Sequence, residues 1–278
     1  MTTSTRERDP TQAGAAALVR ASHPGPAAAV TVMLAAYGVA GGLGPARAAL
    51  VTAAVLAGQL SIGWSNDLAD AARDRRVGRT DKPLATGELP IGAARLACVL
   101  AVLSTAVLSL ACGPAPGVLH LGCVAAGWAY NLRLKATVLS WLPYAVAFGG
   151  YPVFVTLAAP GAGPPLWSVP AAGALLGVGA HLVNVLPDLA DDEATGVRGL
   201  PHRLGHRRAV GWAVACLAAA TVLLVLDVVA SVPGVVVALV LAVVVLLVGL
   251  TLRARGRTPF RAAIGIALVD VLLLVLAA

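Results

Sequence analysis

Residues 66–79 read NDLADAARDRRVGR and follow directly after a long apolar segment. Asn66, Asp70 and Asp74 recur at every fourth residue, and Gly78 follows one step further along. Side chains four residues apart lie on one face of an α-helix, and a glycine often ends a helix. The spacing therefore predicts an acidic stripe on a helix that ends near Gly78.

The same frame occurs once more, 118 residues further along the chain (66 to 184). It consists of Asn184, Asp188, Asp192 and Gly196. An arginine follows each glycine closely, at Arg79 and Arg198. One such stretch would be explained by a solvated acidic loop at the end of a helix. Two matched stretches in a chain with only 13 acidic residues predict a site where clustered charge meets a partner.

The composition indicates a membrane protein. Of 278 residues, 59% are hydrophobic and 12% are charged, whereas soluble domains carry about 25% charged residues. Nine apolar segments have close to the roughly twenty residues that one membrane crossing needs, and they lie at 26–43, 47–66, 92–112, 115–132, 138–159, 167–187, 209–229, 232–252 and 260–277. We expect an all-α integral membrane protein with a bundle of nine transmembrane helices in one domain (25–278), after a disordered cytoplasmic tail (1–24).

The net charge of +7 does not indicate a nucleic-acid partner. If the first span starts from the cytoplasm, all twenty Lys and Arg residues except Arg47 lie on or beside the cytoplasmic face. An excess of Lys and Arg in cytoplasmic loops is typical of multi-pass membrane proteins. We therefore expect a protein of the cell (plasma) membrane whose N-terminus and both acidic stretches are cytoplasmic, and no nucleic-acid binding.

The carboxylates of the two stretches would lie close together if the second and sixth predicted helices pack side by side. Clustered carboxylates repel one another unless a cation neutralises them. Carboxylate oxygens with little Cys or His nearby favour Mg²⁺, which typically binds one or two carboxylates together with phosphate oxygens of a substrate. The candidate metal ligands are Asp70, Asp74, Asp188 and Asp192.

Basic and amide side chains beside these acids suit a diphosphate, because cations and hydrogen-bond donors stabilise phosphate oxygens. These neighbouring groups are Asn66, Arg79, Lys82, Lys135, Asn184 and Arg198. Lys82 and Lys135 are the only lysines among 20 basic residues. Their retention in a chain that otherwise uses arginine suggests that a compact ammonium group is needed at both positions.

These motifs resemble those of the UbiA superfamily of intramembrane aromatic prenyltransferases. The family's first motif, NDxxDxxxD, is complete here as Asn66, Asp67, Asp70 and Asp74. Asp188 and Asp192 match the two acids of the second motif, from which Glu193 and Gly196 depart. The resemblance is specific in these motifs and covers about residues 25–210.

The resemblance implies a helical bundle around a central cavity that opens to the cytoplasmic side and to lipid. In it, Mg²⁺ would bind an isoprenyl diphosphate, whose prenyl group is transferred within the membrane to an acceptor, an aromatic ring such as a quinone precursor. The implied catalytic residues are Asp67, Asp70, Asp74, Asp188, Asp192 and Lys135. The implied diphosphate-binding residues are Asn66, Arg79, Lys82, Tyr130, Asn184 and Arg198.

Other functions remain compatible with the same residues. A terpene cyclase of this type would ionise the diphosphate without an external acceptor, and related enzymes act on phosphosugars. A transporter or other cation-binding membrane protein would use the paired acids as an ion site. Three ionisable groups within predicted spans, Asp227, Asp270 and His181, are interpreted as structural hydrogen-bonding groups, although an intramembrane acid is also a functional candidate.

Overall fold

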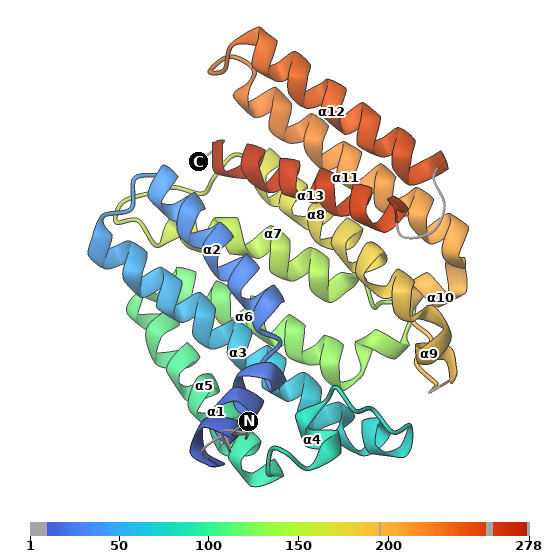
Figure 1. Ribbon diagram of the computed structural model, residues 1–278. Helices are drawn as coiled ribbons and strands as arrows, with labels where there is room; N and C mark the ends of the chain where they lie inside the picture. The colour runs from blue at the N-terminus through green and yellow to red at the C-terminus, as the bar shows by residue number, and fades with distance from the viewer. Residues whose placement is uncertain (1–9, 195, 254–257, 277–278) are drawn as a thin grey trace, which may run out of the picture.

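The computed structural model describes residues 10–194, 196–253 and 258–276. Every regular element within these ranges is helical (Figure 1). The elements follow in the order α1 (Pro10–Ala21), α2 (Pro24–Ala40), α3 (Pro45–Arg76), α4 (Pro83–Thr86), α5 (Ile91–Ala111), α6 (Pro114–Leu132), η1 (Leu134–Ala136), α7 (Leu142–Leu157), α8 (Ser168–Val185), η2 (Leu186–Asp188), α9 (Leu189–Ala194), α10 (Leu200–Leu204), α11 (His206–Val228), α12 (Gly234–Arg253) and α13 (Thr258–Leu276), where η1 and η2 are 3₁₀-helices.

Each of the nine predicted spans coincides with one helix of the structure, namely α2, α3, α5, α6, α7, α8, α11, α12 and α13. Proline occupies the first turn of α2, α3 and α6, where its missing N–H leaves no helical hydrogen bond unmade. Among the described helices, α3, α5, α8, α11 and α12 are long and apolar enough to cross a membrane, and α2 and α7 are shorter apolar helices. The prediction of an all-helical, multi-pass membrane protein is confirmed, and the count of nine crossings stays a prediction.

The helices form two groups that meet at α6 and α7 (Figure 1). In the first group, α3 packs mainly against α2, α5 and α6. In the second, α8 packs mainly against α7 and α11, and α13 covers α8 and α11. This arrangement differs from the expectation that the second and sixth predicted helices pack side by side, because α6 and α7 lie between α3 and α8.

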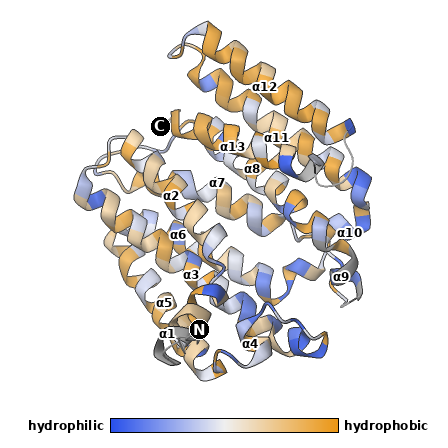
Figure 2. Ribbon diagram, viewed as in Figure 1, coloured by the Kyte–Doolittle hydropathy of each residue, from blue (hydrophilic) through white to orange (hydrophobic). Residues whose placement is uncertain are grey.

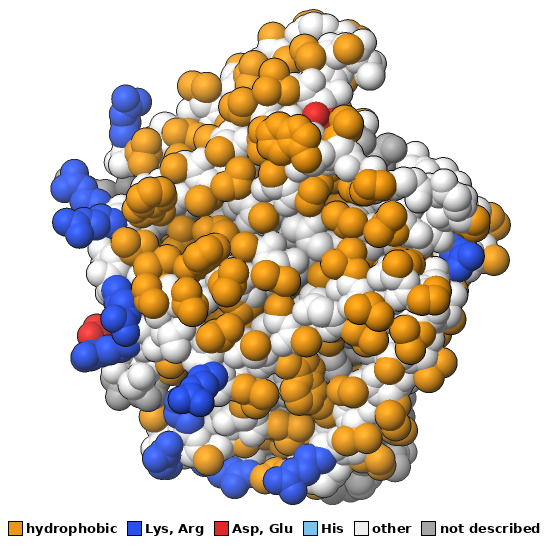
Figure 3. Space-filling view, turned by 180° about the vertical axis from the view of Figure 1, so that it is seen from behind, with side chains coloured by type: hydrophobic (Ala, Val, Ile, Leu, Met, Phe, Trp, Pro, Cys, Tyr) orange, Lys and Arg blue, Asp and Glu red, His pale blue; other side chains and the backbone are white. Residues whose placement is uncertain are grey.

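The surface separates charge from apolar side chains. Hydrophilic residues gather at the end of the bundle where α4, α9 and α10 lie, whereas α12 is apolar up to its last turn, which carries Arg253 (Figure 2). Seen from behind, Lys and Arg line one side and the lower margin of the molecule, and hydrophobic side chains cover most of the remaining face (Figure 3). A broad apolar surface of this kind is what a lipid-facing protein requires.

Over residues 10–24 the structure corrects the expected disordered tail, because Pro10–Ala21 form a packed helix, whereas residues 1–9 lie outside the described residues. Ala17 and Ala21 are fully buried, and the Nε1 of Trp64 donates a 2.9 Å hydrogen bond to a backbone carbonyl of α1. Alanines four residues apart give α1 a narrow, flat face on which α3, α4 and α5 can approach closely. Nothing in the local sequence of this polar segment predicted that contact.

Candidate active site

The first acidic motif lies on the last turns of α3, which continues well beyond the predicted span. Asp67, Asp70 and Asp74 are 2%, 8% and 3% exposed. The helix ends at Arg76, and Gly78 follows with a left-handed φ of 69°. The predicted stripe and the predicted end of the helix are therefore both present.

Two basic side chains hold the carboxylates of the central and last acids of this stripe. The Nζ of Lys135 donates to Oδ1 of Asp70 at 2.5 Å, and the Nη2 of Arg73 donates to its Oδ2 at 3.0 Å. The Nε of Arg73 also lies 3.5 Å from Oδ1 of Asp74. Carboxylates this deeply buried are costly without partners, and these contacts with Lys135 and Arg73 offset that cost.

Asp67 has a different set of partners. Its Oδ1 accepts a 2.7 Å hydrogen bond from Nζ of Lys82 and lies 2.8 Å from Nε2 of His23. Its Oδ2 is buried without a hydrogen-bond partner among the described residues. An unsatisfied buried carboxylate oxygen is uncommon and is an available ligand atom.

The loop after α3 carries a second, exposed charge pair. Nε and Nη2 of Arg79 each donate to one carboxylate oxygen of Asp81, both at 2.8 Å. This bidentate hydrogen bond is the main reason that the pKa of Asp81 is lowered to about 2. Arg79 therefore lies next to the end of the stripe, and its guanidinium is held by Asp81.

The second motif is not held on one helix. Asn184 lies in the last turn of α8, after which the chain passes through η2 and into α9, which carries Asp192. Pro187 explains the break, since it cannot donate a backbone hydrogen bond and its ring crowds the preceding turn. The side chain of Asp188 lies outside the described residues. The structure thus differs from the expected second continuous stripe.

The side chains at the end of the second motif are more exposed than those of the first. Oδ2 of Asp192 lies 3.8 Å from Nε2 of His202, and its side chain is 28% exposed. Arg198, predicted to bind diphosphate, forms a 3.1 Å ion pair with Glu193 at the surface. Gly196 has a φ of 83°, which matches the left-handed glycine at the end of the first motif.

Aromatic side chains occupy the space between the two motifs. Tyr130, at the end of α6, lies within electrostatic reach of both Asp70 and Asp192. Its ring packs edge-on against Tyr144 at 5.2 Å and against His181 at 5.6 Å. Tyr130 thus joins α6 to α7 and α8 through ring contacts.

The α6–α7 connection ties this aromatic cluster to the second motif. It carries Lys135 on η1 and, further along, the buried Ser140. The hydroxyl of Ser140 accepts a 3.0 Å hydrogen bond from the backbone N–H of Leu200 and lies 3.0 Å from Nε2 of His181. The loop that follows the second motif therefore packs on the segment that supplies a lysine to the first. This contact joins His181 of α8 to the α6–α7 connection and not to another helix, so it differs from the hydrogen bond between helices that was expected for His181.

Three residues of this region were not predicted. His23 and Arg73 contact the first motif, and Asn131 holds α6 against α3. Asn131 accepts from Nδ2 of Asn66 at 3.1 Å and donates to the carbonyl of Ile62 at 2.8 Å. A polar residue next to Tyr130 on an apolar helix was a signal available in the sequence, whereas His23 had none.

The two intramembrane acids lie away from this site, as their structural interpretation requires. Oδ1 of Asp270 accepts from the hydroxyl of Thr221 at 2.5 Å, which joins α13 to α11. Oδ1 of Asp227 accepts from Ser168 at 2.9 Å, which joins α11 to α8. Each acid therefore forms a hydrogen bond between helices.

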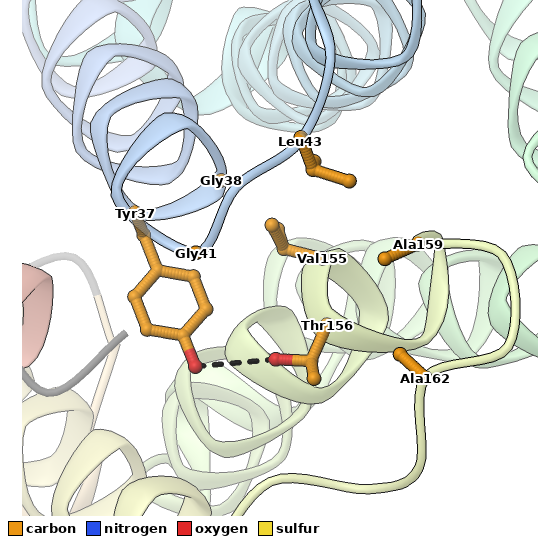
Figure 4. A pocket seen from close by; sticks show the side chains of 8 residues that line it. All are labelled: Tyr37, Gly38, Gly41, Leu43, Val155, Thr156, Ala159 and Ala162. Carbon is orange, nitrogen blue, oxygen red and sulfur yellow. Dashed lines mark hydrogen bonds between the residues drawn. The ribbon is translucent and has the colours of Figure 1, made fainter.

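A small cavity lies where the end of α2 meets the end of α7 (Figure 4). It has a volume of about 80 Å³, and its lining includes Tyr37 of α2 and Thr156 of α7, whose hydroxyls are 3.2 Å apart. Binding sites for small molecules usually have about 300–1,000 Å³. This cavity is too small for a prenyl chain and has no charged side chain in its lining.

No group of three Asp, Glu, His or Cys side chains among the described residues has an arrangement ready to hold a metal ion. Within the first motif, Lys and Arg side chains already contact carboxylate oxygens that a metal would use. A metal would have to displace or redirect these cations.

Residues 26–269 match the UbiA prenyltransferase family. The chain belongs to this family. Membership confirms the resemblance drawn from the motifs and makes the protein a member of a family of membrane prenyltransferases. It also extends the likeness to the last three helices, over which the motifs gave little indication.

One curated relative of this UbiA-family chain is the bacteriochlorophyll synthase 33 kDa chain of Cereibacter sphaeroides. The two are 36% identical over 186 residues, which cover 62% of this chain and 60% of that protein. The match therefore spans less than two thirds of the relative's length.

Two solved structures share the fold at lower sequence identity. A UbiA homolog from Archaeoglobus fulgidus bound to DMAPP and Mg²⁺ is 19% identical with a TM-score of 0.71, covering 94% of this chain and 97% of that one. A digeranylgeranylglyceryl phosphate synthase is 16% identical with a TM-score of 0.73, covering 95% of this chain and 97% of that one. At these identities the likeness establishes the UbiA fold.

Proposed function

We propose that this protein catalyses the Mg²⁺-dependent transfer of a prenyl group from an isoprenyl diphosphate to an acceptor within the membrane. Family membership supports prenyl transfer. The observation that carries the proposal is the pairing of the two lysines of the chain with two buried carboxylates of one motif, Lys82 with Asp67 and Lys135 with Asp70. A diphosphate with its metal suits such pairs, because carboxylates bind the metal and ammonium groups bind phosphate oxygens.

The residues of the site fit Mg²⁺. The donors are carboxylate oxygens, and Oδ2 of Asp67 is buried and free of hydrogen bonds among the described residues. We assign the metal to Asp70, Asp74, Asp188 and Asp192, with Asp67 as the adjoining carboxylate. The A. fulgidus homolog was solved with bound Mg²⁺ and DMAPP, which supports Mg²⁺ as the metal. When bound, Mg²⁺ would neutralise the negative charge that develops on the leaving diphosphate.

Each basic or polar side chain has a role that follows from its position. Lys82 and Lys135 would leave their carboxylates and donate to the diphosphate oxygens. Arg79, three residues before Lys82, would donate to the same diphosphate. Tyr130, in the last turn of α6, and Asn66, on α3, would bind the diphosphate from these two helices. On the side of the second motif, Asn184 and Arg198 complete the predicted set.

The reaction breaks the bond between the allylic carbon and the diphosphate oxygen, and the electron pair leaves with the diphosphate. The acceptor forms the new bond to that carbon and loses a proton. This step requires a dry environment, which the aromatic side chains of α7 supply. Rings of Tyr144 and Phe148 stack at 6.3 Å, and Phe148 contacts Tyr151 at the same distance. These ring faces also stabilise an allylic cation.

We infer that the prenyl chain occupies a central cavity bounded by the motif helices and α7, which opens to the cytoplasmic end. The cytoplasmic assignment rests on the Lys and Arg residues, all of which except Arg47 belong to the tail, loops and helix ends of one side. For the acceptor, we retain an aromatic, quinone-precursor-like ring. The name of the C. sphaeroides relative adds a bacteriochlorophyll-type ring as a second candidate.

A single assay separates the functions that these residues allow. Purified protein in detergent receives Mg²⁺, labelled isoprenyl diphosphates of several lengths, and a panel of quinone-precursor and tetrapyrrole acceptors. We expect prenylated product that depends on both the acceptor and Mg²⁺, and its loss on addition of EDTA. A hydrocarbon formed without acceptor would indicate a terpene cyclase instead. Absence of diphosphate release under every condition would favour a cation-binding or transport protein and contradict the proposal.

A further inference from the structure

His23 is a further residue of the candidate site, although it belongs to neither motif. It lies between α1 and α2, and its Nε2 is 2.8 Å from Oδ1 of Asp67 and 3.1 Å from Nζ of Lys82. Nζ of Lys82 is itself 2.7 Å from the same carboxylate oxygen. Three atoms from three separate segments therefore form a closed triangle.

The fold holds His23 in this position by close packing. The backbone carbonyl of Ser22 approaches α3 so closely that a Cβ on Gly63 would lie 2.0 Å from it, so only glycine fits there. Arg20, in the last turn of α1, pairs with Glu88 beyond α4. The chain just before His23 is thus held against α3 and against the segment that follows α4.

The backbone of His23 is also in an uncommon conformation. Its φ of 54° and ψ of 62° are left-handed, and it is the only non-glycine residue with positive φ among those described. Such a conformation costs free energy for a residue with a Cβ and persists where the surrounding structure requires it. It turns the chain from α1 into α2 and directs the imidazole at Asp67.

The three hydrogen bonds among His23, Asp67 and Lys82 cannot all form at the same time. Lys82 donates to Asp67, whereas Nε2 of His23 either donates to Asp67 or accepts from Lys82, depending on the tautomer. While Lys82 donates to Asp67, Oδ1 of Asp67 already has a donor and does not need a hydrogen bond from His23. When Lys82 leaves, Nε2–H of His23 can keep the same oxygen of Asp67 hydrogen-bonded.

We propose that His23 is a positioning residue that releases Lys82 to the diphosphate. This inference rests on the proposed function, in which Lys82 binds diphosphate oxygens. Asp67 is only 2% exposed, so removing its ammonium partner without a replacement would leave a buried carboxylate oxygen unpaired. His23 supplies that replacement, which lowers the cost of moving Lys82 and strengthens diphosphate binding.

The test measures binding of geranyl diphosphate with Mg²⁺ to the purified full-length protein by titration calorimetry. We expect His23→Leu to raise Kd about tenfold, since Asp67 loses its second donor, while kcat at saturating substrate changes less than about threefold. His23→Gln keeps an N–H donor at a similar reach, and we expect it to restore Kd to within about threefold of wild type.

A double-mutant cycle with Lys82→Met distinguishes positioning from a general structural role. Without Lys82 there is no ammonium to release, so we expect His23→Leu to change Kd less than about twofold in that background. Equal Kd values for wild type and His23→Leu, or equal losses in both backgrounds, would overturn the inference while leaving prenyl transfer intact. A wild-type protein that binds no geranyl diphosphate would instead overturn the proposed function and this inference with it.

Discussion

The two acidic motifs have the same spacing in the sequence, yet the structure holds them in different ways. The first lies on one continuous helix, and its three acids, Asp67, Asp70 and Asp74, are buried and paired with cations. The second is divided among α8, η2 and α9, and the side chain of Asp192 is partly exposed, with its Oδ2 3.8 Å from Nε2 of His202. Spacing alone therefore does not determine how rigidly a carboxylate is presented.

This difference suggests a division of roles in the proposed reaction. A buried, paired carboxylate is already oriented, so little ordering remains when a metal and diphosphate bind. A carboxylate on a short helix after a proline can shift toward a ligand with little loss of packing. We therefore expect the first motif to set the position of the diphosphate and the second to complete the metal shell.

The largest effect should come from Asp70→Asn in the first motif. The amide keeps the size of the side chain but removes the charge that Lys135, Arg73 and the metal all use. We expect release of diphosphate from an isoprenyl diphosphate to fall at least about a thousandfold, without recovery at high Mg²⁺.

The same substitution at Asp227 is the matched control, since this acid is bonded to Ser168 far from the motifs. Asp227→Asn should keep most of the activity even if its thermal stability falls. Substantial turnover by Asp70→Asn, measured as released diphosphate, would mean that the first motif does not hold the metal.

The sequence predicted those features that depend on local pattern. Each of the nine apolar segments coincides with a helix of the structure. The four-residue spacing predicted the acidic stripe on α3 and the end of that helix near Gly78. The contacts of His23 could not be predicted, because they depend on the packing of α1 against residues far along the chain. The break after α8 was predictable in principle, since Pro187 lies within the second frame. The surface pair of Arg198 with Glu193 depends on side-chain geometry that spacing does not determine.

A smaller effect is expected from Asp192→Asn in the second motif. Mg²⁺ usually keeps several water ligands, so water can replace one carboxylate at a partly exposed position. We expect a loss of roughly thirtyfold at low Mg²⁺ that recovers in part as Mg²⁺ is raised. Titration of activity against Mg²⁺ measures this.

Glu193→Gln provides the control, because it removes the same charge one residue away, from a surface pair with Arg198. Its Mg²⁺ dependence should match that of wild type. If Asp192→Asn were as inactive as Asp70→Asn at every Mg²⁺ concentration, the two motifs would be equivalent and the proposed division of roles would be wrong.

The smallest effect should come from Ser140→Ala, which weakens the link between the motifs without touching either. The substitution leaves the N–H of Leu200 and Nε2 of His181 without this partner, which typically costs about 1–3 kcal/mol. We expect a lower unfolding temperature and a loss of activity below about fivefold, seen mainly as a higher Mg²⁺ requirement. Ser104→Ala, at an exposed position of α5, should change neither quantity. An unchanged Mg²⁺ requirement in a destabilised Ser140→Ala protein would mean that the second motif reaches its ligand without help from the α6–α7 connection, so that Lys135 and Asp192 act independently.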